Sequence, residues 1–324
     1  MWYEILYGGV FGITSFSVLF NVPLYIIVLC AVVRHGNRAP FNSPFFKIFF
    51  ALGVVDLMCY SLYLFIKKPI FFGLIPEWAK PFNTPNEYVK LIYPWFYIFG
   101  FYQYQLIFLL NLNRFTCLVT PRFYLNYCQH KTTKTCIALL AVLSFIIGFP
   151  GFQMQAQISE YTIEIDGINR TMHYGPIMKG DVAPYLSIVW RLHVYTLLFL
   201  GLIMYAVMFF VTRRALIKGN GQNRSKNRPE MKLFYMALAL FSVNFGFAIY
   251  FWLSTKTTSH LNEWILLIMS DIYDLPNGII LWFTCRDIRR VVWKPQNFKF
   301  NENLKTITVT PIQRTTSTLS TGYI

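Results

Sequence analysis

The chain has 324 residues, of which 55% are hydrophobic, 19% aromatic and only 13% charged. Soluble domains carry about 25% charged residues, so this composition argues against a soluble globular protein and predicts a membrane protein. The formal net charge of +15 also occurs in nucleic-acid-binding proteins. Here the basic residues gather beside hydrophobic segments, and no nucleic acid is expected as a partner.

Seven hydrophobic segments of roughly 20 residues each are predicted to cross a membrane as helices. They cover residues 9–33, 45–66, 91–119, 135–155, 186–211, 233–254 and 263–285. The predicted fold class is therefore an all-α membrane protein, a seven-transmembrane helix bundle over residues 9–285 after a short extracellular N-terminus, residues 1–8. Residues 286–295 predict a short amphipathic helix at the cytoplasmic surface. The polar residues 296–324, rich in Ser and Thr, predict a disordered cytoplasmic tail.

The distribution of Lys and Arg predicts the orientation, because the cytoplasmic loops of membrane proteins carry an excess of them. With the N-terminus outside, the inner segments hold 21 of the 29 Lys and Arg residues, and eight of the 14 acids lie outside. This pattern predicts a multi-pass protein surrounded by membrane lipids. The glycosylation sequon at 169–171 lies in a segment predicted outside, so Asn169 is expected to carry a glycan. A second triplet of this kind, at 223–225, lies on the predicted inner side.

Polar residues inside the predicted spans are candidates for function, since ionisable groups are costly within a membrane. A central polar network is predicted from three spans. Its members are Asn21, Asp56, Asp271, Asp274 and Asn277. A switching or ion-binding role is one interpretation. The other is that these groups satisfy one another and fix the packing of the helices.

The third span runs from an aromatic and amide end to an arginine end. A helix from residue 93 to Arg114 rises about 32 Å, so Arg114 is expected at the inner membrane face, next to Asn113. Phe96, Phe99 and Gln103 share a narrow stripe with Arg114 at 100° per residue. The alternative for Arg114 is an interfacial arginine whose side chain extends toward the headgroups.

The outer ends of the third, fifth and seventh spans predict an apolar ligand pocket with a few polar groups. The candidates are Phe96, Phe99, Gln103, Arg191, His193 and Trp264. The alternative for each aromatic residue is ordinary packing or an interfacial belt. The sequence contains no metal-ligand spacing, phosphate-binding glycine loop or nucleophile motif, so no enzyme activity, metal or cofactor is expected.

Three motifs resemble those of G protein-coupled receptors with the rhodopsin-like architecture. Residues 113–115, Asn-Arg-Phe, close the third span, residues 52–56 are similar to the Leu-x-x-x-Asp pattern of the second helix, and residues 274–277 are a loosened form of the seventh-helix proline motif. Three features depart from the pattern. Asn113 replaces the acidic residue before the arginine, the sixth span has no proline, and the usual outer disulfide has no cysteines. The Asn113 departure puts the usual acid–arginine lock in question.

The departures point to one group of receptors. The run Phe-Asn-Ser-Pro-Phe-Phe-Lys-Ile-Phe-Phe at 41–50, Gly-Val-Val-Asp at 53–56 and Asn-Arg-Phe-Thr at 113–116 resemble the nematode serpentine chemoreceptors of the class gamma (Srg) superfamily, with class V (Srv) the closest class. The resemblance covers residues 10–293. It implies a chemosensory receptor of the plasma membrane, at sensory cilia, that binds an external small molecule and activates a heterotrimeric G protein. It also implies that Arg114 is the switch residue and that Asp56 belongs to the central polar network.

A membrane transporter or channel is the alternative function, with Asp56, Asp271 and Asp274 as a proton or cation path. A carrier needs polar residues at several depths of the membrane. In the third span they are concentrated at Gln103, Gln105 and the inner end, which favours the receptor.

Overall fold

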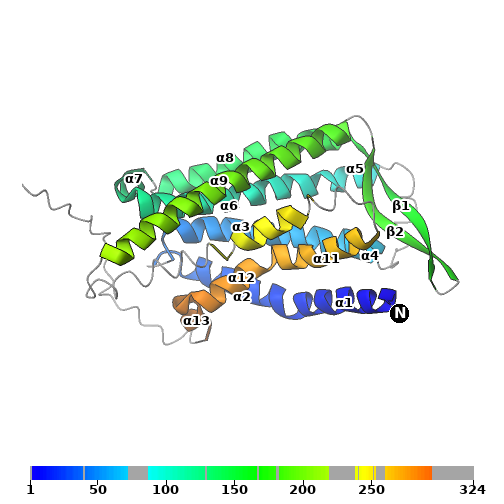
Figure 1. Cartoon of the computed structure of the whole chain (residues 1–324), viewed down its shortest axis with the longest axis horizontal. Helices are drawn as coiled ribbons and strands as arrows, with labels where there is room; N and C mark the ends of the chain where they lie inside the picture. The colour runs from blue at the N-terminus through cyan, green and yellow to red at the C-terminus, as the bar shows by residue number, and fades with distance from the viewer. Residues whose placement is uncertain are drawn as a thin grey trace, which may run out of the picture.

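The computed structural model describes residues 2–38, 41–71, 87–127, 130–165, 168–179, 182–218, 238–239, 241–250, 252 and 260–293. Most of these residues are helical, and the long helices run side by side along the longest axis of the molecule (Figure 1). Helices occur in all seven predicted spans, as expected for a seven-helix bundle. The predicted cytoplasmic tail, 296–324, lies outside the described residues.

The first span is one continuous helical segment made of α1 (Trp2–Phe16), the π-helical turn η1 (Ser17–Asn21) and α2 (Val22–Arg34). Helix therefore starts at Trp2, whereas the prediction started the span at residue 9. The widened turn η1 precedes Pro23, one of the first two residues of α2. Proline has no amide hydrogen to donate to the preceding turn, which accounts for the irregular hydrogen bonding there.

Prolines open the next helices as well. The second span consists of α3 (Pro44–Leu62), η2 (Tyr63–Lys67) and α4 (Lys68–Phe71). The third consists of α5 (Glu87–Ile92) and α6 (Pro94–Val119), and α7 (Pro121–Tyr127) follows it. Proline is favoured at the first helical position because the amide it lacks would have no partner there.

A β-hairpin that was not predicted connects the fourth and fifth spans. The fourth span is α8 (His130–Gly148) with the 3-10 turn η4 (Phe149–Gln153), and the fifth is α9 (Val182–Lys218). Between them β1 (Gln155–Ile165) pairs antiparallel with β2 (Ile168–Lys179), and the register shifts between Ile158 and Ser159. Figure 1 shows the hairpin at the end of the bundle where the N-terminus lies.

The sixth span is described over Phe241–Tyr250, and the seventh is interrupted at a proline. The seventh contains α11 (His260–Asp274) and α12 (Pro276–Thr284), separated at Leu275, as expected where Pro276 removes a backbone donor. The predicted surface helix is present as α13 (Arg286–Trp293). Its Ile288 and Val291 are buried against the bundle.

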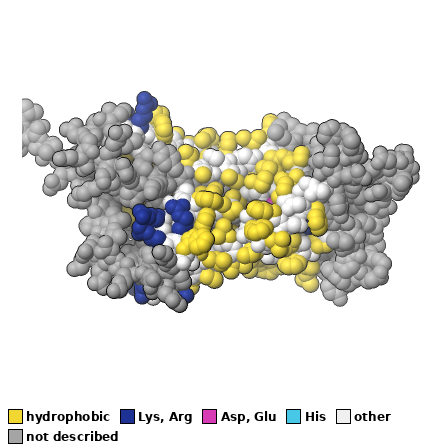
Figure 2. All heavy atoms as spheres, turned by 90° about the horizontal axis from the view of Figure 1, so that it is seen from below, with side chains coloured by type: hydrophobic (Ala, Val, Ile, Leu, Met, Phe, Trp, Pro, Cys, Tyr) yellow, Lys and Arg dark blue, Asp and Glu magenta, His cyan; other side chains and the backbone are white. Residues whose placement is uncertain are grey.

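Five described segments are long and apolar enough to cross a membrane by length and composition. They are Gly8–Arg34, Pro44–Lys67, Lys131–Gln153, Val182–Arg214 and Ile265–Thr284. With 26 residues, α6 is also long enough, but its amides and Arg114 make it more polar. In Figure 2 hydrophobic side chains cover the middle of the described surface, and Lys and Arg side chains gather at one end of it.

The third span organises the interior. Helix α6 contacts α3, α8 and α9, and both large hydrophobic clusters include its residues. Leu106 and Leu110 belong to the cluster with α2, α3 and α12, while Tyr104 belongs to the cluster with α9 and the sixth span. A side chain on α6 is therefore placed to contact most of the bundle.

Candidate functional site

A cavity of about 160 Å³ lies at the bundle end that carries the β-hairpin. It is bounded by the end of the second span, the first half of α6, the start of α9, the sixth span and α11. Of the sixteen described residues that line it, eight are aromatic. We call it the aromatic cavity, and an apolar cavity with a few polar groups is the usual composition of a small-molecule site.

One wall of the aromatic cavity depends on a glycine. The Trp190 ring packs edge-on against Tyr97, Phe101 and Tyr104, with centroid distances of 5.9, 4.9 and 5.7 Å. This approach is allowed because Gly100 has no side chain, since a Cβ built there would lie 2.4 Å from Trp190 Cη2. Gly100 thus lets α6 and α9 come close enough for the indole to line the cavity.

Gly100→Ala is expected to lower the stability of the protein by about 1–3 kcal/mol, because the added methyl overpacks a rigid indole. Gly246 is the matched control, a helical glycine with nothing within 4 Å of its built Cβ. Gly246→Ala is expected to raise stability by about 0.5–1 kcal/mol through the helical preference of alanine. Unfolding temperatures of the purified variants in detergent check both signs. Equal shifts of the unfolding temperature in the two variants would contradict the role given to Gly100 in the packing of Trp190.

The floor of the aromatic cavity is a buried network of polar side chains, which we call the Asp56 network. Gln103 Nε2 donates to Asp56 Oδ1 at 2.7 Å and to Asp274 Oδ1 at 3.1 Å. The other oxygen, Asp56 Oδ2, accepts from the hydroxyl of Tyr25 at 2.6 Å and from Asn277 Nδ2. Five side chains from the first, second, third and seventh spans thus meet within a bundle that leaves each of them at most 3% exposed.

Tyr25 reaches Asp56 through a second gap left by glycine. A Cβ on Gly278 would lie 2.5 Å from Tyr25 Cδ2, so only glycine allows α12 and the tyrosine ring to come this close. The ring is fully buried and also packs near Phe49, at a centroid distance of 6.4 Å. The hydrogen bond between the first and second spans therefore rests on tight packing with the seventh.

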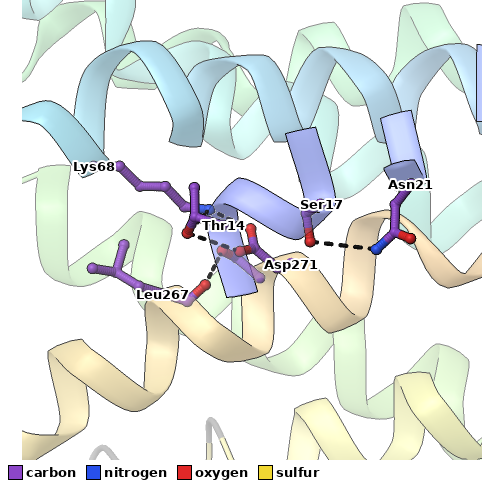
Figure 3. A network of polar contacts seen from close by, with 7 residues as sticks. Thr14, Ser17, Asn21, Lys68, Leu267 and Asp271 are labelled. Carbon is purple, nitrogen blue, oxygen red and sulfur yellow. Dashed lines mark hydrogen bonds and ion pairs between the residues drawn. The ribbon is translucent and has the colours of Figure 1, made fainter. Parts of the chain in front are cut away.

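The structure corrects the predicted central polar network in two members. Asn21 donates to Ser17 Oγ at 3.4 Å, one turn earlier on the same helix, and does not bond Asp56. Asp271 pairs instead with Lys68, whose ammonium also donates to Thr14 Oγ1 at 3.1 Å. Figure 3 shows this Lys68 cluster of Thr14, Lys68 and Asp271 joining the first, second and seventh spans. Among the described contacts, neither Asn21 nor Asp271 has a hydrogen bond to Asp56.

The predicted pocket residues divide into three groups. Phe96 and Gln103 line the aromatic cavity. Phe99, Arg191 and His193 are not lining residues. Phe99 packs against the Trp95 ring and His193 against the Phe101 ring. Arg191 donates at 2.9 Å to Oγ of Ser187, which does line the cavity. The side chain of Trp264 lies outside the described residues.

Arg114 lies near the opposite end of α6 and is buried, with 8% of its surface exposed. Its guanidinium carbon stands 3.8 Å from the centroid of the Phe45 ring, a cation–π contact between the third and second spans. In the described part of the chain no carboxylate lies within ion-pair distance of it. Asn113 is buried beside it, and Asn111 Oδ1 accepts a 2.7 Å hydrogen bond from Tyr205 on α9.

The family model "Serpentine type 7TM GPCR chemoreceptor Srv" matches residues 14–298, which is most of the chain. The chain belongs to the Srv family. A comparison with curated proteins finds no match. The predicted Srg-type resemblance and the class V assignment are both confirmed. The Srv chain is a multi-pass membrane protein of a chemoreceptor family, with the seven-helix architecture expected from its sequence.

Two contributors to the site of the Srv chain escaped the sequence analysis. Lys68 follows an apolar span and resembles an interfacial lysine, although an isolated acid such as Asp271 in the seventh span needs a cation. Tyr25 is one of 21 tyrosines, and nothing in its local pattern marks it. Among the described residues of the Srv chain, no group of three His, Cys, Asp or Glu side chains is arranged to hold a metal ion.

Proposed function

We propose that this Srv receptor binds an external small molecule in the aromatic cavity and responds by activating a heterotrimeric G protein at the opposite end of the bundle. The observation that carries the proposal is the position of Gln103. Its side chain lines the cavity and also bonds both carboxylates of the Asp56 network. A ligand that contacts Gln103 or Asp274 therefore acts directly on groups that hold four spans together.

Helix α6 connects the two ends of the molecule. Gln103 and Arg114 are eleven residues apart on this helix, a rise of about 16 Å. Between them, the Asn111 bond to Tyr205 ties α6 to α9. A ligand shifts a conformational equilibrium only by its differential affinity for the two states. The Asp56 network supports a difference in ligand affinity between two conformations, because its hydrogen bonds depend on the relative positions of helices that line the cavity.

The inner end supports a role for Arg114 as the switch. The contact with Phe45 and the buried neighbour Asn113 hold the guanidinium inside the bundle without a carboxylate among the described residues. Within the described part of the chain, releasing this arginine separates it from an aromatic ring and breaks no ion pair. We propose that separation of the inner ends of the third, fifth and sixth spans exposes Arg114 to the G protein.

The proposed location is the plasma membrane, at a sensory cilium, with the N-terminus outside. The excess of Lys and Arg at the end away from the hairpin supports this orientation (Figure 2). The proposed glycan at Asn169 agrees with it, because Asn169 pairs with Glu164 near the turn of the hairpin, at the N-terminal end of the bundle. Membrane lipids cover the apolar middle.

The test is G protein activation in cells by a panel of volatile and water-soluble cues, for the wild type and for Arg114→Ala. The G protein response of the variant is expected to be at least about tenfold weaker than that of the wild type, a factor within the usual range of coupling energies. The two receptors carry an N-terminal tag and are compared at equal amounts on the cell surface. Arg34→Ala is the control. It removes an exposed arginine in the last turn of α2, and is expected to respond normally.

A different result would favour a transporter or channel. Ion currents or solute uptake that persist without any G protein, and that disappear in Asp56→Asn, would show that the buried carboxylates form a path. Equal responses of wild type and Arg114→Ala would remove the switch role even if the protein signals.

A further inference from the structure

The aromatic cavity contains a carboxylate that the bundle satisfies on one side only. Asp274 lines the cavity and is 2% exposed. Its Oδ1 accepts from Gln103, whereas Oδ2 has no hydrogen-bond partner among the described residues. A buried carboxyl oxygen without a partner is costly, so Oδ2 marks a position where a ligand donor would replace a missing interaction.

Charge at the cavity floor points to a positive ligand. Asp56 and Asp274 share the amide of Gln103, and no Lys, Arg or His in the described part of the chain forms an ion pair with either. The nearby buried cation, Lys68, is bound to Asp271. Two carboxylates in one buried network repel each other, and a cation placed beside Oδ2 reduces that repulsion.

The aromatic walls of the cavity are also suited to a positively charged ligand. Above the floor, Tyr273 stacks on Phe247 at a centroid distance of 4.5 Å and lies 5.8 Å from Tyr104. Lys67 also lines the cavity, and its Nζ lies 5.0 Å from the centroid of the lining residue Tyr63, so one ring of this lining already holds a cation. Aromatic faces attract ammonium groups through their quadrupoles, and they also receive the apolar part of an organic cation.

We infer that the ligand of the aromatic cavity is a small organic amine in its protonated form. Its ammonium donates to Asp274 Oδ2, and its apolar part packs against Tyr104, Phe247 and Tyr273. This inference rests on the proposed function only in taking the cavity as the ligand site. The volume of about 160 Å³ sets the size, since a dry cavity of about 150 Å³ holds benzene. One aromatic ring with a short amine chain fills it.

The experiment measures binding without a G protein. The unfolding temperature of the purified full-length receptor is followed with benzylamine and 2-phenylethylamine, and with the alcohol and carboxylate analogues of each, at equal millimolar concentrations. At least one amine is expected to raise the unfolding temperature, and its alcohol and carboxylate analogues to raise it less. This comparison uses the wild type alone, so it does not depend on a variant that folds.

Asp274→Asn tests the assignment of the carboxylate, because it keeps the shape of the side chain and removes its charge. The amine concentration that gives the same rise in unfolding temperature is expected to be at least tenfold higher for this variant than for the wild type. For Asp287→Asn it is expected to be unchanged. Asp287 lies on α13, outside the cavity. The inference is overturned if no amine stabilises the wild type, if the alcohols or carboxylates stabilise it more than the amines, or if Asp274→Asn binds amines as well as the wild type.

The outcomes separate this inference from the proposed function. Amine binding without G protein activation would leave the ligand class standing and remove the coupling. Activation by other cues, in a receptor that no amine stabilises, would leave the receptor function standing and remove the ligand class.

Discussion

Lys68→Ala is expected to lower the free energy of unfolding by about 3–5 kcal/mol, the usual effect of removing one member of a buried ion pair. The side chains of Lys68 and Asp271 are 2% and 1% exposed. Without the ammonium, the 3.1 Å hydrogen bond from Thr14 Oγ1 is the one side-chain contact that the described residues leave to Asp271. An uncompensated carboxylate would then remain inside the bundle, where water cannot solvate it.

The measurement is unfolding by SDS in mixed micelles, with a double replacement as the decisive comparison. Lys68→Met with Asp271→Leu removes both charges and fills similar volume, so it is expected to lose less stability than Lys68→Ala alone. The exposed pair of Arg290 and Asp287, with an N–O distance of 4.0 Å, is the control. Arg290→Ala is expected to cost less than about 0.5 kcal/mol. A double variant less stable than Lys68→Ala would contradict the uncompensated carboxylate as the cause of the loss.

Asp56→Ala is the second replacement with a large expected effect, a loss of about 3–6 kcal/mol. It removes the acceptor of Tyr25 and Asn277, and one of the two acceptors of Gln103. Each buried donor left without a partner costs about 1–3 kcal/mol. The loss is expected to disturb the floor of the aromatic cavity as well, because Nε2 of Gln103 then has Asp274 as its one remaining acceptor among the described residues.

Ser61→Ala on the same helix is the matched control for Asp56→Ala. Ser61 is exposed and bonds only the carbonyl of Leu57 within its own helix, so its replacement is expected to change stability by less than about 0.5 kcal/mol. Asp56→Asn should fall between the two, since an amide keeps one acceptor oxygen. If Asp56→Ala were as stable as Ser61→Ala in mixed micelles, the Asp56 network would have no structural role.

Hydropathy along the chain predicted the seven helical spans because a membrane span is a local property, a run of apolar residues of sufficient length. The irregular points also followed from local chemistry, since the turn before Pro23 and the break before Pro276 both occur where an amide hydrogen is missing. The hairpin escaped prediction although Thr162 to Ile165 alternates polar and apolar residues as a strand does.

The candidate site was only partly predictable. Asp56, Asp274 and Asn277 were recognised as one network from the cost of burying such groups in a membrane, and Gln103 was recognised as a cavity residue. The cavity walls at Trp190 and Tyr273 depend on how helices rotate toward each other, and no period in the sequence gives that rotation.

By itself, the sequence determined which residues enter the membrane, which end of the bundle is basic, and that buried acids would need partners. The tertiary structure alone decided the partners. Asp271 pairs with Lys68 across 203 residues, and Asn277 reaches Asp56 across 221. The physical reason is that hydropathy and periodicity act over a few turns of one helix. The pairing of buried charges depends instead on the rotation and depth of several helices packed together, which small residues such as Gly100 and Gly278 permit.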